Sequence, residues 1–248
     1  MTINDLYFEL NKRIPASLSC DWDNDGIMCM SEPERQVKRV LLTLDVTEQA
    51  VKRAVDLGFD LIISHHPLIF HPLKSITNGR LISLIKNGVG AFAFHTRLDI
   101  ANGGVNNALA ELLKLKNVRR FGEDGLGAIG ELEEETADTE LGKYIKNALN
   151  SDSVKGIFTG RTVKVVAVLG GAGGDYVCQA YEAGADFYLS GEIGYNKMLD
   201  QAATGMSICA AGHYFTEQPV LTKLEEMIKN IDKDIEVEIF QCNEIKEI

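Results

Sequence analysis

The sequence predicts an α/β protein made of two similar halves, each containing βαβ units, that form a layered unit with parallel or mixed sheets. Three observations lead to this fold class. Short apolar runs of strand length alternate with amphipathic stretches of helix length. The second half repeats the pattern of the first at an offset of 126 residues. The 248 residues are 45% hydrophobic and 25% charged, which is typical of a folded globular protein.

The first half reads as strand, helix, strand, helix, strand. Thr47 precedes a helical stretch with one apolar face, and Gly58 follows its end. A helix between two strands implies parallel strands joined by a right-handed crossover. The expected strands are 40–44, 61–63 and 91–94, and the expected helices are about 47–57 and 80–86.

The repeat is clearest where Leu57–Ser64 aligns with Ala183–Ser190, because Gly, Asp and Ser then coincide. With a further shift of about nine residues, each half ends its third strand in His-x-x-x-carboxylate. The alternative is that βαβ units resemble one another for physical reasons alone, since Leu-Gly-x-Asp is a common helix-to-strand turn. We expect one unit over residues 1–248, with halves at about 1–122 and 123–248.

The remaining segments are simpler. The acidic stretch 131–140 is interpreted as a solvated face or loop, because such runs rarely form a site. Pro219 suits the first position of a helix that runs to about residue 229. The other expected elements are helices at 105–115 and 139–149 and strands at 126–131 and 235–240.

Charge and cysteine content narrow the possible functions. The net charge of −11 argues against a broad nucleic-acid surface, because phosphate neutralisation supplies most of that affinity, although a local basic pocket stays possible. The five cysteines are scattered without a C-x-x-C pair, which indicates a reducing compartment. No signal-like or membrane-spanning apolar run is visible, so we expect a cytoplasmic protein without membrane contact.

Four of the five histidines directly follow predicted strands: His65, His66, His95 and His213. Ligands of open α/β sheets bind beyond the carboxyl ends of the strands. Imidazole together with carboxylate suits divalent Zn, Fe, Mn, Ni or Co better than Ca or Mg. Adjacent histidines on extended chain point to opposite sides, which favours two ions with Asp99 or Glu217 between them. Each histidine alone could instead be a hydrogen-bonded structural residue, and His71 is expected in a loop beside the site.

Several motifs together resemble the Nif-three-like family, whose members are labelled GTP cyclohydrolase I type 2 homologues or dinuclear metal centre proteins. The order and spacing match from about Asp5 to Phe240, as in the short form without the middle insert domain. The matching motifs are Asp21–Ile27, Ser64–Phe70, His95–Asp99 with Gly103–Asn106, Ser190–Glu192 and Gly212–Glu217.

The resemblance implies two divalent metal ions at the carboxyl ends of the strands, between the halves. One ion would be bound by His66 and Asp99, and the other by His65 and His213. Glu217 would bridge them. The implied metal ligands are therefore His65, His66, Asp99, His213 and Glu217.

Two further residues are candidate catalytic groups. His95 is not counted as a ligand in the family, but the repeat places it opposite His213, so it would support the ligands or carry a proton. Glu192 stands where His66 stands in the first half. The chain departs from the family pattern at Ile27–Met30, and Arg97 replaces an asparagine or proline. These departures do not affect the expected ligands. Because of them, the resemblance does not extend to a conserved substrate pocket near residues 22–30.

The glycine-rich segment 169–174 follows a strand, as a phosphate-binding turn would. Tyr176 replaces the third glycine of the dinucleotide fingerprint, so we expect a tight, closely packed turn instead. Cys178 and Cys209 are expected in the core. Trp22, flanked by Asp21, Asp23 and Asp25, is expected to pack its indole within a turn, and the alternative is a contact at the rim of the site.

By resemblance the chain is a metal-dependent hydrolase that opens the purine ring of GTP at C8 and releases formate. The residue pattern by itself predicts only metal-assisted hydrolysis. Phosphoesterase or amidohydrolase chemistry would use the same ligands. The other hypothesis is a non-catalytic metal-binding, scaffold or metal-delivery protein that acts through a homo-oligomeric ring. The resemblance implies a homohexamer, and a nucleotide or other small phosphorylated molecule is the expected substrate.

Overall fold

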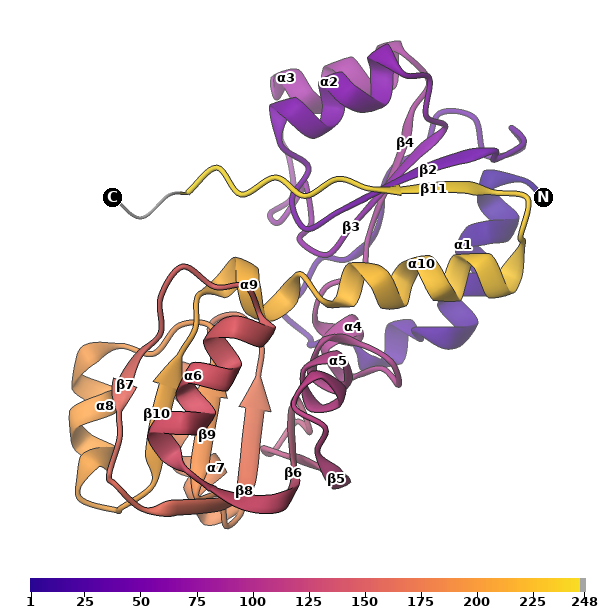
Figure 1. The fold of residues 1–248 in the computed structure, drawn as a ribbon. Coiled ribbons are helices and arrows are strands. Elements are labelled where there is room, and N and C mark those ends of the chain that lie inside the picture. Colours follow the sequence, from indigo (N-terminus) through magenta and orange to yellow (C-terminus); the bar gives the residue numbers. More distant parts are fainter. Residues whose placement is uncertain (246–248) are drawn as a thin grey trace. The chain divides into compact units, whose positions relative to one another are not determined.

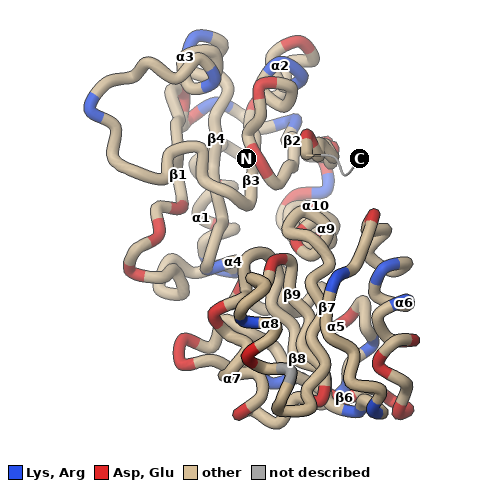
Figure 2. The backbone as a smooth tube through the Cα atoms, turned by 90° about the vertical axis from the view of Figure 1, so that its left-hand side faces the viewer, with Lys and Arg blue, Asp and Glu red and all other residues tan. Residues whose placement is uncertain are grey.

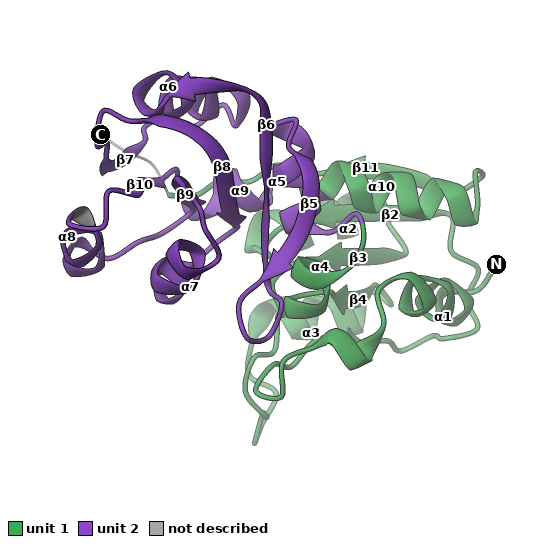
Figure 3. Cartoon of the chain, turned by 90° about the horizontal axis from the view of Figure 1, so that it is seen from below, with its two compact units in different colours: residues 1–102, 221–246 green, residues 103–220, 247–248 purple. Residues whose placement is uncertain are grey.

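The computed structural model describes residues 1–245, which form two compact units (Figure 1). Among the described residues, unit 1 consists of Met1–Asn102 and residues 221–245, and unit 2 consists of Gly103–Val220 (Figure 3). The sequence places the boundary of the halves near residue 122, whereas the chain after Leu221 returns to unit 1. No helix described in either unit is long and apolar enough to cross a lipid bilayer.

Unit 1 contains a five-stranded sheet in the order β1-β4-β3-β2-β11. The four strands that the sequence predicts are parallel, and β1, which it does not predict, pairs antiparallel with β4 at the edge. The strands are β1 (Gly26–Cys29), β2 (Arg39–Thr43), β3 (Leu61–Ser64), β4 (Gly90–Ala93) and β11 (Glu236–Ile239).

Helices cover both faces of this sheet (Figure 1). The helices α2 and α3 pack on one face, where Leu41, Ile62 and Leu84 share a buried cluster. Tyr7 of α1 contacts Phe92 on the opposite face. The helical segments are α1 (Ile3–Arg13), η1 (Ala16–Leu18), α2 (Glu48–Asp56), α3 (Gly79–Lys86), α4 (Thr96–Ile100) and α10 (Val220–Ile231).

Unit 2 contains a six-stranded mixed sheet in the order β5-β6-β8-β9-β10-β7. Its central strands β8, β9 and β10 are parallel. The strand β6 runs antiparallel to β8, β7 runs antiparallel to β10, and the edge strand β5 runs antiparallel to β6. The acidic stretch continues β6 and is largely exposed, as expected for a solvated face. The strands are β5 (Lys116–Phe121), β6 (Gly127–Ala137), β7 (Lys155–Ile157), β8 (Thr162–Leu169), β9 (Phe187–Ser190) and β10 (Ser207–Ala210).

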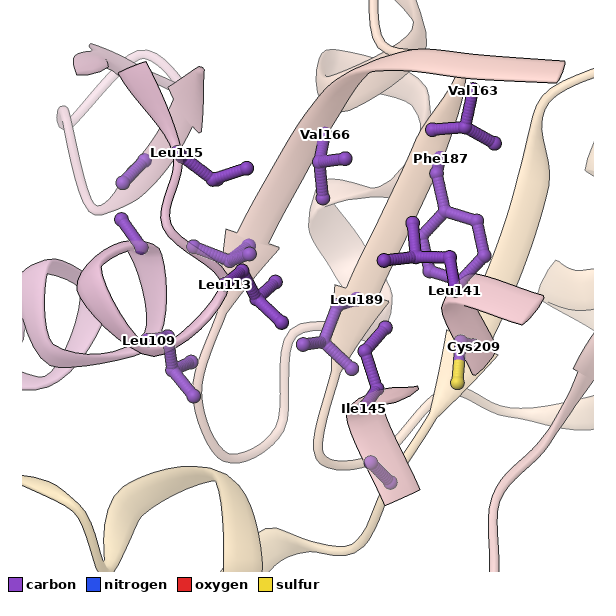
Figure 4. Packing of buried hydrophobic residues seen from close by; sticks show 14 of the residues in the cluster. Leu109, Leu113, Leu115, Leu141, Ile145, Val163, Val166, Phe187, Leu189 and Cys209 are labelled. Atoms are coloured by element: carbon purple, nitrogen blue, oxygen red, sulfur yellow. The ribbon is translucent and has the colours of Figure 1, made fainter. Parts of the chain in front are cut away.

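The core of unit 2 packs α5 and α6 against the central strands through Leu109, Ile145 and Leu189 (Figure 4). Cys209 lies in this core as predicted, but Cys178 is exposed, because the short helix α7 buries only the stripe that contains Val177 and Ala180. The helical segments are α5 (Val105–Leu112), α6 (Asp138–Ala148), η2 (Gly174–Tyr176), α7 (Val177–Glu182), α8 (Tyr195–Ala202) and α9 (His213–Glu217). Figure 2 shows Lys and Arg scattered among Asp and Glu along the described part of both units.

The two units repeat one hydrogen-bonding device. Oδ2 of Asp60 accepts hydrogen bonds from two consecutive backbone N–H groups at the start of β2, at 2.8 and 3.0 Å. Oδ2 of Asp186 accepts from the two equivalent N–H groups of β8, at 3.0 and 2.8 Å. The strand register repeats as well, since Thr43 pairs with Ser64 and Leu169 pairs with Ser190. The predicted internal repeat is therefore present in the structure.

Replacing Asp60 by Asn should destabilise unit 1 by about 1 to 3 kcal/mol, because hydrogen bonds to a charged acceptor contribute that much. Asp60 is buried and also pairs with Arg35 at 2.7 Å. Urea unfolding can be followed by the fluorescence of Trp22, the single tryptophan of the chain, which lies in unit 1. The matched control Asp56→Asn, on the exposed face of α2, should change the free energy of unfolding by less than about 0.5 kcal/mol. Equal effects of the two substitutions would refute the structural role of Asp60.

Candidate functional site

Unit 1 brings four of the predicted site residues to one edge of its sheet. His65 and His66 follow β3, His95 follows β4, and Asp99 lies in the helix α4. Each of the three histidines offers a ring nitrogen within 4.8 Å of those of the other two. Nε2 of His65 also lies 3.7 Å from Oδ1 of Asp99. These residues meet because the carboxyl ends of neighbouring parallel strands lie at the same edge.

Hydrogen bonds at Nδ1 set the orientation of the adjacent histidine rings. Nδ1 of His65 donates to the carbonyl of Phe94 at 2.9 Å, and Nδ1 of His66 donates to Oδ1 of Asp45 at 2.9 Å. A carbonyl and an ionised carboxylate only accept hydrogen bonds, so the proton of each neutral ring is on Nδ1. Each Nε2 therefore presents a lone pair, which is the arrangement found in metal-binding histidines.

His95 is held in the same way by Asp23. Its Nδ1 donates to Oδ1 of Asp23 at 2.8 Å, while Thr96 donates to Oδ2 from its backbone and its hydroxyl at 3.0 and 2.6 Å. Burial alone would raise the pKa of Asp23, but the hydrogen bonds from His95 and Thr96 lower it to about 2. Asp23 is therefore ionised at neutral pH and fixes the ring of His95. His95 thus lies beside His65 and His66 and belongs with them to a group of histidines that could hold a metal ion.

A buried ion pair between Arg97 and Asp25 anchors the loop that also carries Asp23. Arg97 is fully buried, its Nε lies 3.0 Å from Oδ2 of Asp25, and its Nη1 donates to Asn11 at 2.7 Å. Its guanidinium also lies 4.6 Å from the centre of the Phe94 ring. Burial raises the pKa of the Asp25 carboxyl, and the charge of Arg97 opposes this shift. The departure from the family pattern at Arg97 therefore has a structural consequence and does not touch the candidate ligands.

Unit 2 contributes His213 and Glu217, which lie one turn apart on α9. Nδ1 of His213 is 3.2 Å from Oε1 of Glu192, and its Nε2 is 3.1 Å from Oε1 of Glu217. When Nδ1 donates to Glu192, a neutral ring directs its Nε2 lone pair at a carboxylate oxygen. The lone pair of His213 Nε2 and the carboxylate oxygen of Glu217 would repel each other at 3.1 Å unless a cation, either a proton or a metal ion, lies between or beside them. The nitrogen and oxygen donors thus fit a divalent transition ion.

The glycine-rich turn after β8 closes against these two side chains. Gly171 has a φ of +66°, and a Cβ added there would collide with Oε1 of Glu217 and lie 3.1 Å from Nε2 of His213. Its N–H donates to Oγ1 of Thr216 at 3.0 Å. The expected tight turn is confirmed, and only a glycine leaves space beside the donor atoms.

Three features of the site differ from the sequence prediction or were absent from it. Trp22 is 63% exposed, so the expectation that its indole packs inside is wrong. The reason is that its neighbour Asp23 turns inward to His95, which directs the indole to solvent. The roles of Asp23 and Asp45 were not predicted. Asp45 follows the end of β2. It could have been predicted from the tendency of ligands to bind beyond the carboxyl ends of parallel strands, had that tendency been applied to β2 as well.

Fold and side chains together define a class of protein: a two-sheet α/β protein with groups of histidines and carboxylates that could hold metal ions at the carboxyl ends of its strands. The chain belongs to the family described as Duf34/NIF3 (NGG1p interacting factor 3), whose model matches residues 1–247.

Individual relatives agree with this assignment. The chain is 32% identical to a GTP cyclohydrolase 1 type 2 homolog of Clostridium perfringens, over 95% of both chains. It is 30% identical to the homolog of the same name from Lactococcus lactis, over 96% of this chain and 95% of the relative. The crystal structure of Staphylococcus aureus protein SA1388 superposes with a TM-score of 0.90 at 25% identity, covering 100% of this chain and 99% of the other.

Substituting Gly171 by Ala should lower the affinity of the protein for Zn²⁺ by about tenfold or more, as loss of a supporting contact does at metal sites. The added methyl group would displace Glu217 and His213, and metal affinity can be measured by competition with a chromophoric chelator. Gly160→Ala is the matched control, because Gly160 has a φ of +75° and no atom within 4 Å of an added Cβ. It should cost only backbone strain and leave Zn²⁺ binding unchanged. Wild-type affinity in Gly171→Ala would contradict this prediction.

Replacing Arg97 by Met should destabilise unit 1 by about 3 to 5 kcal/mol, because it leaves the buried carboxylate of Asp25 without its counter-charge. The double variant Arg97→Met/Asp25→Asn removes both charges and should recover part of that loss. Urea unfolding monitored by Trp22 fluorescence gives both values. If the double variant is no more stable than Arg97→Met, the ion pair is not the source of the stabilisation.

Proposed function

We propose that this protein is a hydrolase with two divalent metal ions bound by His65, His66, Asp99, His213 and Glu217. One observation carries the proposal: each of these three histidines, and His95 as well, lies with Nδ1 beside an acceptor, which is the orientation found in metal-binding histidines. The number of ions and their assignment to ligands follow the family resemblance.

The proposed pairing gives His66 and Asp99 to one ion, His65 and His213 to the other, and Glu217 to both. The number of two ions rests on the family resemblance, because the adjacent rings of His65 and His66 lie with their centres 4.9 Å apart and do not point to opposite sides as the sequence had suggested. Imidazole and carboxylate donors favour Zn, Fe, Mn, Ni or Co. When bound, the ions would lower the pKa of a water and polarise the scissile group of the substrate.

The remaining residues of the site have separate tasks in this proposal. The Asp23 carboxylate holds the Nδ1 proton of His95, so Nε2 of that ring can accept a proton and return it to a leaving group. Glu192 holds Nδ1 of His213 and thereby directs Nε2 of that ring toward Glu217. His95 is thus proposed as the proton carrier and Glu192 as a positioning residue.

The names of the relatives from Clostridium perfringens and Lactococcus lactis make GTP the first substrate to test. The corresponding reaction adds water at C8 of the purine, opens the five-membered ring and releases formate. The same ligands would also serve a phosphoesterase, which would release inorganic phosphate. The five scattered cysteines support the proposal that the protein acts in the cytoplasm.

Protein loaded separately with Zn²⁺, Mn²⁺, Fe²⁺, Co²⁺ and Ni²⁺ should release formate from GTP, and His65→Ala/Glu217→Ala should abolish this activity. The exposed variant Lys52→Ala is the matched control and should keep it. Formate is measured enzymatically, and inorganic phosphate is measured in the same samples. Formate release no greater than that of the double variant would eliminate the cyclohydrolase proposal, and phosphate without formate would support the phosphoesterase.

Burial of the ligands favours a second candidate function. His65 and Glu217 are buried, and buried ligands suit ions that are saturated by protein donors and not open to substrate. The protein would then be a metal-binding scaffold or metal-delivery protein that acts as a homo-oligomeric ring, by resemblance a hexamer. Light scattering after size exclusion measures the oligomeric state, and X-ray absorption of the loaded protein shows whether a coordinated water is present.

A further inference from the structure

Two exposed aromatic side chains lie next to the histidines of unit 1. Trp22 is 63% exposed and Phe70 is 41% exposed. Their ring centres are 6.2 Å apart, and their planes are inclined by 45°. The two tilted rings therefore form a V that is partly exposed to solvent, and the ring of His71 lies edge-on to Phe70 at 4.9 Å. Adjacent exposed aromatic rings are a candidate ligand-binding surface.

The V is continuous with the candidate metal ligands through His95. The ring of His95 lies edge-on to Trp22 at 6.2 Å and to Phe70 at 6.4 Å. The same ring lies 5.3 Å from His65 and 5.6 Å from His66. A flat molecule stacked on Trp22 would thus be separated from His65 and His66 by one imidazole.

The loops that carry the two aromatic residues are fixed before any ligand binds. The side chain of Asn24 donates to the carbonyl of Ile69 at 2.5 Å, which ties the loop of Trp22 to the loop of Phe70. Asp23, which directly follows Trp22, is hydrogen-bonded to His95. A rigid pair of rings loses little conformational entropy when it binds a ligand.

The size and charge of this surface favour a small molecule over a protein partner. One Trp and one Phe provide far less than the roughly 800 Å² that each partner of a stable protein interface buries. Asp21, which directly precedes Trp22 in the chain, is exposed, and its negative charge disfavours an anionic group nearby. A neutral aromatic heterocycle satisfies both conditions, because every such ring has a face that stacks on indole.

We infer that Trp22 and Phe70 bind the neutral heteroaromatic ring of the substrate by stacking and present it to His95 and the metal ligands. This inference deepens the proposed hydrolase function and rests on it for the position of the reacting atoms. The stacking itself needs no metal ion. Anionic substituents of the substrate would be directed away from Asp21.

The single tryptophan makes the test direct, since all indole emission of the chain comes from Trp22. Metal-free and Zn²⁺-loaded protein are titrated with guanosine, which has the ring but no phosphate, and with ribose 5-phosphate, which has the phosphate but no ring. Guanosine should quench the emission saturably in both forms after correction for absorbance, and ribose 5-phosphate should not. Equal quenching by the two compounds, or none by guanosine, would overturn the inference.

Variants separate stacking from other causes of quenching. Phe70→Leu should raise the Kd for guanosine at least about fivefold, which is the lower end of the effect of removing one stacking partner. The matched control Phe8→Leu removes another exposed aromatic ring of unit 1, 55% exposed on α1, and should leave Kd unchanged. An unchanged Kd in Phe70→Leu would refute the role of the V.

Two further outcomes are distinguished by the same samples. If Zn²⁺ binds with high affinity but guanosine does not, the stacking inference fails and the metal proposal stands. If guanosine binds and Zn²⁺ does not, the metal proposal fails alone. Emission that depends on protein concentration without ligand would show that a second copy of the chain covers the V, and this would also overturn the inference.

Discussion

The chemistry of this protein depends on one hydrogen-bonding constraint: the Nδ1 atoms of its strand-end histidines lie against fixed acceptors. A backbone carbonyl holds His65, and Asp45, Asp23 and Glu192 hold His66, His95 and His213. Without these acceptors each imidazole could rotate or exchange its proton between nitrogens. With them, each Nε2 is positioned before a ligand arrives, which is the preorganisation that metal binding and catalysis both require.

The fold supplies this constraint twice. In each unit, parallel strands end at a common edge, and a short helix follows the third strand and carries a carboxylate one turn after a histidine. The aspartate at the start of β3 or β9 binds two N–H groups of the neighbouring strand, which sets the strand register and the height at which each strand ends. The repeat is therefore a structural reason for two groups of ligands.

The interior of unit 1 and its surface chemistry are connected through one loop. Arg97 neutralises Asp25 within the core, Asp23 turns inward to His95, and Trp22, which directly precedes Asp23 in the chain, is exposed. The inward side chains thus hold the indole at the surface. An exposed tryptophan beside histidines is consequently a product of the same interactions that fix the candidate site.

The sequence by itself determined the βαβ strands, the repeat and the residues after the strand ends, because hydrophobic period and local turn chemistry are encoded in neighbouring residues. It did not determine the antiparallel edge strand β1, the return of α10 and β11 to unit 1, or the exposure of Trp22 and Cys178. These depend on contacts between residues distant in the chain, such as Asp23 with His95 and Arg97 with Asp25. Only the tertiary structure paired each histidine with its acceptor, since a hydrogen bond is decided by position in space and not by spacing along the chain.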